Sequence, residues 1–160
     1  MSTLAWPSGY ELREWAEIDS TNEEARRLAA AGEKGPVWLR ADRQTAGRGR
    51  RGRAWESPTG NLAATLLIAP SKPASECAQL SFVTAIAAAD TASVFASGAD
   101  IKVKWPNDVL ANGRKLAGIL LESASGADSV LSFLAIGVGM NLAHFPPDTE
   151  FPATSLAALG

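Results

Sequence analysis

The sequence is poor in the residues that build metal sites and disulfide bonds. Its 160 residues include one cysteine, Cys77, and one histidine, His144. A lone cysteine cannot close an intrachain disulfide bond, and the two residues cannot supply a zinc site or a two-histidine metal motif. His144 also lies in a proline-rich stretch, where we expect it to take no part in catalysis. Any chemistry must therefore come from lysine, arginine, aspartate or backbone groups.

Long apolar runs are also missing. No stretch reaches the roughly 18 consecutive apolar residues that a membrane-spanning helix needs. The N-terminal sequence MSTLAWPSGYELREW lacks the basic stretch and apolar run of a signal peptide. The sequence therefore predicts a soluble, cytoplasmic protein with no membrane partner.

An excess of positive charge is the third absence. Lysine and arginine number 15 against 17 aspartates and glutamates, which gives a formal net charge of -2. This balance argues against a protein that coats nucleic acid by bulk charge. A chain of this length buries roughly 70% of its unfolded surface, and it shows no internal repeat or break in composition. We therefore expect a single globular domain over residues 1–160.

The first half of the chain alternates strand and helix patterns. A helix should begin at Ser20 or Thr21, because each hydroxyl has a glutamate three residues later and can form a capping box. This helix should end near Gly32. Strands are expected at residues 10–18, 36–41 and 62–69, and a loop at residues 42–61.

The second half predicts a long helix and three further strands. Apolar residues recur every three or four positions over residues 75–97, which indicates one helix with a face toward the sheet. That face comprises Cys77, Leu80, Val83, Ala87, Thr91, Val94 and Phe95. Strands are expected at residues 101–105, 116–121 and 130–138, the last two paired as a hairpin, with a turn-rich connection at residues 106–114 and a helix beginning at residues 155–159.

The segment from Arg40 to Arg53 carries six of the 15 basic residues, interleaved with three glycines. Guanidinium groups on a flexible, glycine-rich backbone can hold phosphate oxygens in pairs. The same composition also fits a patch that binds nucleic acid or a solvated loop, and composition alone does not separate the three. The sequence contains no GxxxxGK[ST] run, which excludes a P-loop nucleotide site.

Polar groups at strand ends form a second candidate site. Lys102 and Lys104 share one face of a predicted strand, and Lys115 opens the next one beside a compact turn. Lys102 has the character of an ordinary surface lysine. Gly137 and Gly139 leave one face of a strand bare, which permits close approach of a flat group or marks a bulge.

Five runs of residues in order resemble the biotin protein ligase family. They are STN at residues 20–22, QTAGRGRRGRAW at 44–55, KWPND at 104–108, RKLAGILLE at 114–122 and GVGMN at 137–141. The resemblance covers about residues 18–159. It implies an α+β fold, a mixed sheet flanked by helices, related to class II aminoacyl-tRNA synthetases and lipoate ligases.

The resemblance implies a ligase that uses ATP and Mg²⁺ to convert biotin to biotinyl-5'-adenylate. The enzyme then transfers the biotinyl group to one lysine of the biotin carboxyl carrier protein of acetyl-CoA carboxylase or a related carboxylase. No DNA or membrane partner is implied, and a homodimer is among the assemblies that the resemblance allows. The motifs begin by residue 20 and the sequence ends at Gly160. We therefore expect a form without a DNA-binding domain that is incomplete at its C-terminal end relative to the family.

Site residues follow from the matching motifs. Lys115 and Arg50 are implied as catalytic, with Lys115 bridging the biotin carboxylate and the α-phosphate, and Asp108 as the metal ligand. The implied biotin-binding residues are Ser20, Thr21, Asn22, Gln44, Gly47, Arg48, Lys115 and Gly118. The implied ATP- and adenylate-binding residues are Arg50, Arg53, Trp55, Lys104, Asn107, Asp108 and Asn141.

Two other functions remain as alternatives. A lipoate or octanoate ligase or transferase would share the fold and use a related pocket for an acyl chain. A nucleic-acid-binding module would instead act through the arginine- and glycine-rich segment, and its affinity would fall steeply with salt.

Overall fold

A computed structural model describes residues 6–126 and 130–160 of the chain. The described residues form one mixed seven-stranded sheet in the order β1-β2-β3-β7-β6-β5-β4. Only β1 and β2 pair in parallel among these strands. The strands are β1 (Glu11–Ile18), β2 (Val37–Gln44), β3 (Leu62–Ile68), β4 (Ile101–Lys104), β5 (Asp108–Ala111), β6 (Arg114–Ser125) and β7 (Leu131–Met140). The helices are α1 (Thr21–Ala30), α2 (Ala74–Cys77) and α3 (Leu80–Phe95), with short 3-10 turns η1 (Arg50–Gly52) and η3 (Leu156–Ala158).

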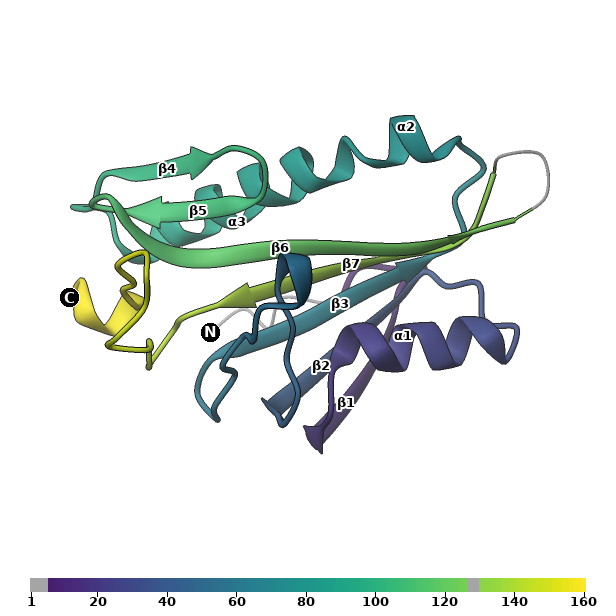
Figure 1. Ribbon diagram of the computed structural model, residues 1–160, viewed down its shortest axis with the longest axis horizontal. Helices are drawn as coiled ribbons and strands as arrows, with labels where there is room; N and C mark the ends of the chain where they lie inside the picture. The colour runs from purple at the N-terminus through teal and green to yellow at the C-terminus, as the bar shows by residue number, and fades with distance from the viewer. Residues whose placement is uncertain (1–5, 127–129) are drawn as a thin grey trace.

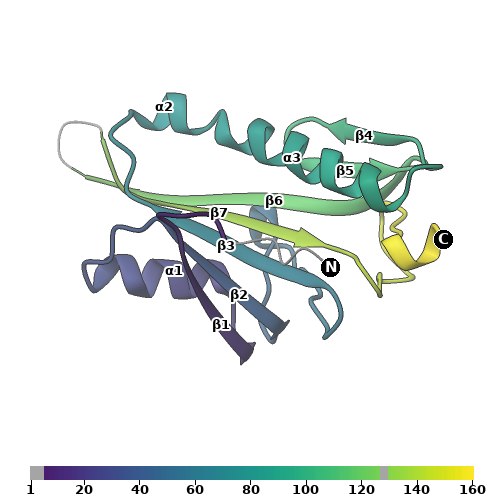
Figure 2. The same cartoon turned by 180° about the vertical axis from the view of Figure 1, so that it is seen from behind.

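Helices cover both faces of the sheet, as Figures 1 and 2 show from opposite sides. α1 packs on β2, β3 and β7, where Ala25, Val37, Leu39 and Leu67 belong to one buried cluster. α3 lies along β4, β5 and β6 on the other side, over a cluster that includes Ile119. The expected α+β fold with a mixed sheet flanked by helices is confirmed.

The helix α1 begins where the sequence predicts. Ser20 has extended backbone angles, and its hydroxyl accepts a hydrogen bond from the Glu23 amide. The Glu23 carboxylate does not complete the capping box, because it binds Arg26 and Arg48 instead. Asp19 replaces it and accepts the Ser20 amide at 2.7 Å.

The long helix differs from the prediction in two ways. The chain breaks it between α2 and α3, and the buried face of α3 consists of Ala85, Ala88 and Ala92. The larger residues Val83 and Val94 of the predicted face are exposed, at 58% and 77%. Alanines allow the helix backbone to approach the sheet closely, and this packing overrode the apparent pattern of the bulky residues.

The stretch from Ala74 to Phe95 differs from the expectation that no part of the sequence has the character of a membrane-spanning helix. By length and composition alone these 22 residues, which contain an 18-residue window with a mean hydropathy of 1.3, are long and apolar enough to cross a bilayer. In this fold they lie along the sheet, and 17% of the apolar window is buried.

The connection expected at residues 106–114 is instead a strand and a turn. β5 pairs with β4 on one side and β6 on the other, and Asn112 and Gly113 form the second turn with positive φ angles of 50° and 76°. Asn-Gly is the residue pair that such a hairpin turn requires. β2 also runs to Gln44, beyond the expected end at residue 41, because its last residues pair with Glu17 and Ile18 of β1. The expected hairpin of β6 and β7 is confirmed, and the expected C-terminal helix is the 3-10 turn η3.

Candidate active site

A cavity of about 670 Å³ lies on the α1 side of the sheet, where the loop after β2 passes over β6 and β7. All the site residues that the sequence predicts, except Gly47, contribute to its lining. They are Ser20, Thr21, Asn22, Gln44, Arg48, Arg50, Arg53, Trp55, Lys104, Asn107, Asp108, Lys115, Gly118 and Asn141. Segments far apart in the sequence therefore meet at one concave site.

One part of the cavity wall is built from buried, uncharged polar groups at the start of α1. Ser20, Thr21 and Asn22 are each at most 5% exposed. The Thr21 amide donates to Gln44 Oε1 at 2.8 Å, which orients the Gln44 side chain. Asn22 donates to Glu122 Oε2 at 2.8 Å and accepts from Thr65, so both ends of its amide are bound within the protein.

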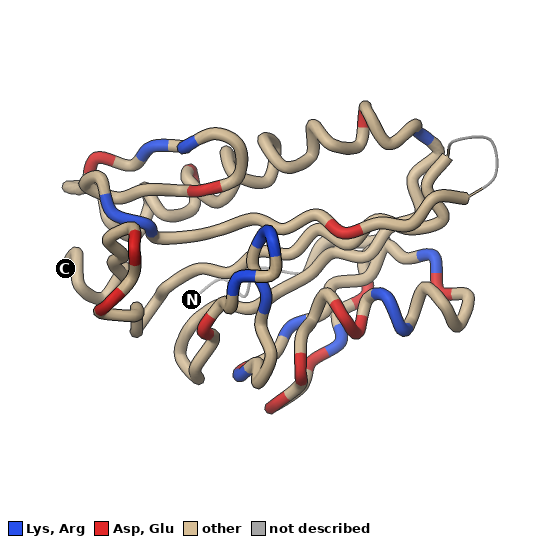
Figure 3. The backbone as a smooth tube through the Cα atoms, viewed as in Figure 1, with Lys and Arg blue, Asp and Glu red and all other residues tan. Residues whose placement is uncertain are grey.

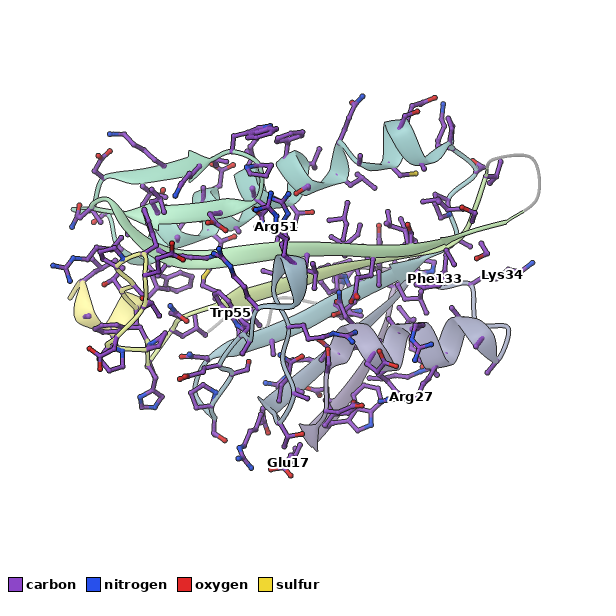
Figure 4. All side chains as sticks on the ribbon, viewed as in Figure 1. Glu17, Arg27, Lys34, Arg51, Trp55 and Phe133 are labelled. Carbon is purple, nitrogen blue, oxygen red and sulfur yellow. The ribbon has the colours of Figure 1, made fainter. Side chains whose placement is uncertain are left out.

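Arginines of the loop after β2 form the opposite part of the wall. Figure 3 shows its basic residues gathered in front of the sheet, and Figure 4 labels Arg51 and Trp55 on the same loop. Arg48 pairs with Glu23 at 3.0 Å and Glu122 at 3.4 Å. Arg26 and, to a lesser extent, Arg48 lower the pKa of Glu23. Arg50 donates to Asn107 Oδ1 at 3.2 Å.

Gly47 supports the loop. The Trp55 amide donates to the Gly47 carbonyl at 2.9 Å, and a Cβ on Gly47 would lie 2.4 Å from the Trp55 carbonyl oxygen. This contact leaves no room for a side chain at residue 47. The structure therefore places Gly47 in the loop backbone that carries Trp55.

Trp55 explains the bare strand face that the sequence analysis noted. A Cβ on Gly139 would lie 2.4 Å from Trp55 Nε1, and a Cβ on Gly118 would lie 3.4 Å from Trp55 Cζ3. Gly137 has a different neighbour, because a Cβ there would lie 2.3 Å from Asn22 Oδ1. The glycines of β6 and β7 therefore admit an indole ring and an amide, and β7 has a regular register with β6 at both of its glycines.

Two lysines face this cavity from the β4–β6 side. Lys115 Nζ lies 2.8 Å from Asp108 Oδ1, as an ion pair, and 5.5 Å from the centre of the Trp55 ring. Lys104 Nζ lies 3.7 Å over the ring of Phe151. Lys115 is thus held on a paired strand with its charge beside an aromatic face.

A family model described as "Biotin/lipoate A/B protein ligase family" matches residues 16–141. The chain belongs to this family. The biotin–[acetyl-CoA-carboxylase] ligase of Paracoccus denitrificans is 51% identical over 132 residues, which are 82% of this chain and 54% of that protein. The bifunctional ligase/repressor BirA of Bacillus subtilis is 37% identical over 88% of this chain and 44% of its own length. The chain spans about half the length of these curated relatives.

Solved structures place this member of the ligase family in the same fold. Biotin protein ligase from Leishmania major in complex with biotinyl-5-AMP is 31% identical, with a TM-score of 0.74 over 95% of this chain and 64% of that one. Biotin protein ligase from Aquifex aeolicus in complex with biotin and ATP is also 31% identical, with a TM-score of 0.72 over 91% and 59%. The fold is that of biotin protein ligases.

The C-terminal tail forms a part of the cavity wall that the sequence did not predict. Pro146, Thr149, Glu150, Phe151 and Ala153 line the cavity. The tail is held because the Lys115 amide donates to the Pro152 carbonyl and the Thr154 amide donates to the Lys115 carbonyl. No local motif signals this arrangement, which depends on how a proline-rich segment folds back beside β6.

Some basic residues of the candidate segments lie outside the cavity. Arg40 pairs with Glu14, and Arg43 with Glu17, along the edge of β1 and β2. Lys102 pairs with Asp100 and is an exposed surface lysine, as expected. The phosphate-binding interpretation therefore applies to Arg48, Arg50, Arg51 and Arg53, which line the cavity.

The residues present fit a magnesium ion that arrives with a nucleotide. Asn141 Oδ1 is buried on the cavity wall and accepts no hydrogen bond in the described part of the chain. The Asp108 carboxylate lines the same cavity and is paired with Lys115 through Oδ1. Within that part no group of three histidine, cysteine, aspartate or glutamate side chains could hold a metal ion alone. Mg²⁺ commonly takes one or two protein oxygens and completes its shell with phosphate oxygens and water.

Proposed function

We propose that residues 1–160 form the catalytic domain of a biotin protein ligase. It joins the biotin carboxylate to the α-phosphate of ATP, which releases pyrophosphate, and holds the resulting biotinyl-5'-AMP. The carbonyl carbon of the adenylate is then attacked by a lysine amine of a biotin carboxyl carrier protein, and AMP leaves. Family membership and the fold support this proposal.

The observation that carries the proposal is one cavity lined by both a neutral polar wall and a cluster of cations. Biotin has a cyclic urea, and the hydroxyls and amides of Ser20, Thr21 and Gln44 offer hydrogen-bonding groups that suit it. The reaction brings a carboxylate and a phosphate together, and fixed cations lower the barrier to such a step. Lys115, Arg50 and Arg53 line the same cavity and supply those charges.

We assign the remaining roles on the same grounds. Trp55 offers an aromatic face for adenine, and Asp108 with Asn141 would hold the Mg²⁺ of Mg-ATP. Bound there, the ion would neutralise phosphate charge and favour loss of pyrophosphate. We further propose a cytoplasmic location and a carboxylase carrier domain as the acceptor, and leave a homodimer to measurement.

The experiment that tests the function is pyrophosphate release from ATP and Mg²⁺, with and without biotin. Biotin should start the release, and lipoate at the same concentration should not. Calorimetry with both compounds gives the matching affinities. Tighter binding of lipoate would favour the lipoate ligase alternative, and biotin-independent release would contradict the proposal.

The nucleic-acid alternative has little support from the charges. Arg40 and Arg43 are engaged by glutamates of β1, and Arg48 by two further glutamates, so fewer cations of the segment are available to phosphates of a long polymer. The proposal therefore assigns the remaining loop arginines to a small anionic ligand.

A further inference from the structure

A row of linked polar side chains runs beneath the neutral wall of the cavity. Asn22 Nδ2 donates to Glu122 Oε2 at 2.8 Å and to the Leu120 carbonyl at 3.3 Å. Thr65 Oγ1 lies 2.7 Å from Asn22 Oδ1 and 2.8 Å from Thr21 Oγ1. Thr21 Oγ1 in turn lies 3.0 Å from Gln44 Oε1. Four oxygens are therefore joined by three short contacts.

Thr65 is the member of this row that no motif indicates. It lies in the middle of β3, is 0% exposed and does not line the cavity. Its neighbours along the strand are the apolar Ala64 and Leu66. A buried hydroxyl is costly unless it is hydrogen-bonded, so the position of Thr65 needs a reason beyond packing.

The number of available protons decides which group donates and which accepts in each hydrogen bond of this row. The nitrogen of the Asn22 amide faces two acceptors, so its oxygen can only accept. The same holds for Gln44 Oε1, which accepts the Thr21 amide at 2.8 Å. Only the hydroxyls of Thr21 and Thr65 carry protons, one each, for three oxygen–oxygen contacts. One contact must therefore lack a proton.

The contact without a proton is the one that leaves no buried oxygen without a hydrogen bond. Asn22 Oδ1 is buried and takes the proton of Thr65, since Thr65 Oγ1 is its nearest hydroxyl donor at 2.7 Å. Thr65 Oγ1 then accepts the proton of Thr21. Gln44 Oε1 already has the Thr21 amide, so the contact between Thr21 Oγ1 and Gln44 Oε1 is left without a proton. Two acceptor oxygens 3.0 Å apart, from residues that line the cavity, are then available to one external donor.

We propose that Thr65 is a positioning residue that turns the Thr21 hydroxyl into an acceptor for a ring N–H of the ligand. This inference rests on the proposed function, in which that N–H belongs to the cyclic urea of biotin. Thr65 touches no ligand atom. It acts by taking the hydroxyl proton of Thr21, so that a ligand N–H meets lone pairs and not a competing donor.

The test measures the binding of biotin and of its two cyclic carbamate analogues, each with one ring N–H replaced by oxygen, to the 160-residue chain. In the wild-type chain one analogue should bind about tenfold more weakly than biotin, because it brings an acceptor to two acceptors. Thr65→Val keeps the side-chain shape and removes the hydroxyl. It should weaken biotin binding about tenfold and reduce the preference over that analogue to about twofold or less.

Two further variants separate positioning from folding. Thr65→Ser keeps the hydroxyl and should retain the preference, whereas a general packing defect would lower the affinities for biotin and both analogues by the same factor. Thr91→Val removes a hydroxyl from the exposed side of α3, where it bonds the Ala87 carbonyl, and should change no affinity. Thermal denaturation of each variant reports the folded state.

Two results would overturn the inference. The first is an unchanged preference for biotin in a folded Thr65→Val variant. The second needs no variant and is equal binding of biotin and both analogues by the wild-type chain. Failure of the wild-type chain to bind biotin is a separate result, which would remove the proposed function and this inference with it.

Discussion

Lys115 shows how the chain directs a single charge. It lies on β6, its backbone is fastened on one side to the C-terminal tail, and its ammonium group lies 2.8 Å from Asp108 and beside Trp55. A cation held in this way stabilises charge without reorganisation when a carboxylate meets a phosphate.

Lys115→Gln should lower the rate of adenylate formation at least about a hundredfold, the scale of losing one preorganised group at a charged transition state. The melting temperature should change little, because Lys115 is half-buried and Gln keeps two of its four methylene groups and a polar end. Lys102→Gln removes an exposed lysine outside the cavity and serves as the control. Equal loss of activity in both variants would mean that bulk charge, and not the position of Lys115, matters.

Gly139 is the residue that admits Trp55. Gly139→Ala places a Cβ 2.4 Å from Trp55 Nε1, so the indole ring must move away from β7. We expect ATP binding in the presence of biotin to weaken about tenfold or more, as the loss of a stacking face suggests. Gly98→Ala adds a methyl group where no atom lies within 4 Å and should leave the affinity unchanged. Calorimetry with a non-hydrolysable ATP analogue measures both, and an unaffected Gly139→Ala variant would contradict the assignment of Trp55 to adenine.

At the scale of elements, the loop that contains η1 is held over the cavity by contacts to residues on other elements. Arg48 ties it to Glu23 at the start of α1 and to Glu122 on β6, and Arg50 ties it to Asn107. These contacts are exposed and few, so an anionic ligand can compete for the same guanidinium groups.

Arg50→Gly should let biotinyl-5'-AMP dissociate about tenfold faster, since the contact to Asn107 and one phosphate ligand are lost together. Labelling of lysines on a bystander protein should rise accordingly. Arg43→Gln removes one positive charge outside the cavity, where Arg43 pairs with Glu17, and should leave the dissociation rate unchanged. Identical dissociation rates in the wild type and Arg50→Gly would contradict a closing role for the loop.

The junction of β1 and α1 is stabilised by a carboxylate whose charge depends on pH. Hydrogen bonds from Arg27, followed by one from the Ser20 amide, lower the pKa of Asp19 from 3.8 to about 2. A lowered pKa in the folded state means that this contribution is present above about pH 4 and is lost as the pH falls through 2.

Asp19→Asn should therefore lower the free energy of unfolding at pH 7 by up to about 1 kcal/mol, a figure limited by the exposure of the pair. The difference from wild type should shrink as the pH falls from 4 toward 2, as urea denaturation at each pH would report. Asp90→Asn on the exposed side of α3 is the control. A difference that grows toward acid would contradict the sign of the pKa shift.

The same elements show what the sequence could predict. Ser20 as the cap of α1, the strand that carries Lys102 and Lys104, and the β6–β7 hairpin follow from local patterns, and the structure confirms them. The apolar side of that strand is not buried as predicted, because Val103 is 39% exposed. β5 was missed although Asn112 and Gly113 are a strong turn signal. The prediction of the buried face of α3 was wrong, because alanines and not the larger residues contact the sheet. This contact depends on strands that are far away in the sequence.

On the scale of the whole molecule, the site is a long-range assembly. The order of the motifs, through the family resemblance, predicted the residues that line the cavity. Their distances to one another follow from the sheet order, which places β7 between β3 and β6. Thr65 and the wall formed by Phe151 could not be predicted, because their roles depend on side chains that meet across strands and on the path of the tail.

The central claim is that this cavity makes and holds biotinyl-5'-AMP. The direct measurement is to incubate the chain with biotin, ATP and Mg²⁺, separate it from small molecules, and identify the bound species by mass spectrometry. We predict one biotinyl-5'-AMP per folded chain, none without biotin, and little with Lys115→Gln. A folded wild-type chain that binds ATP and biotin but yields no biotinyl-5'-AMP would contradict the claim.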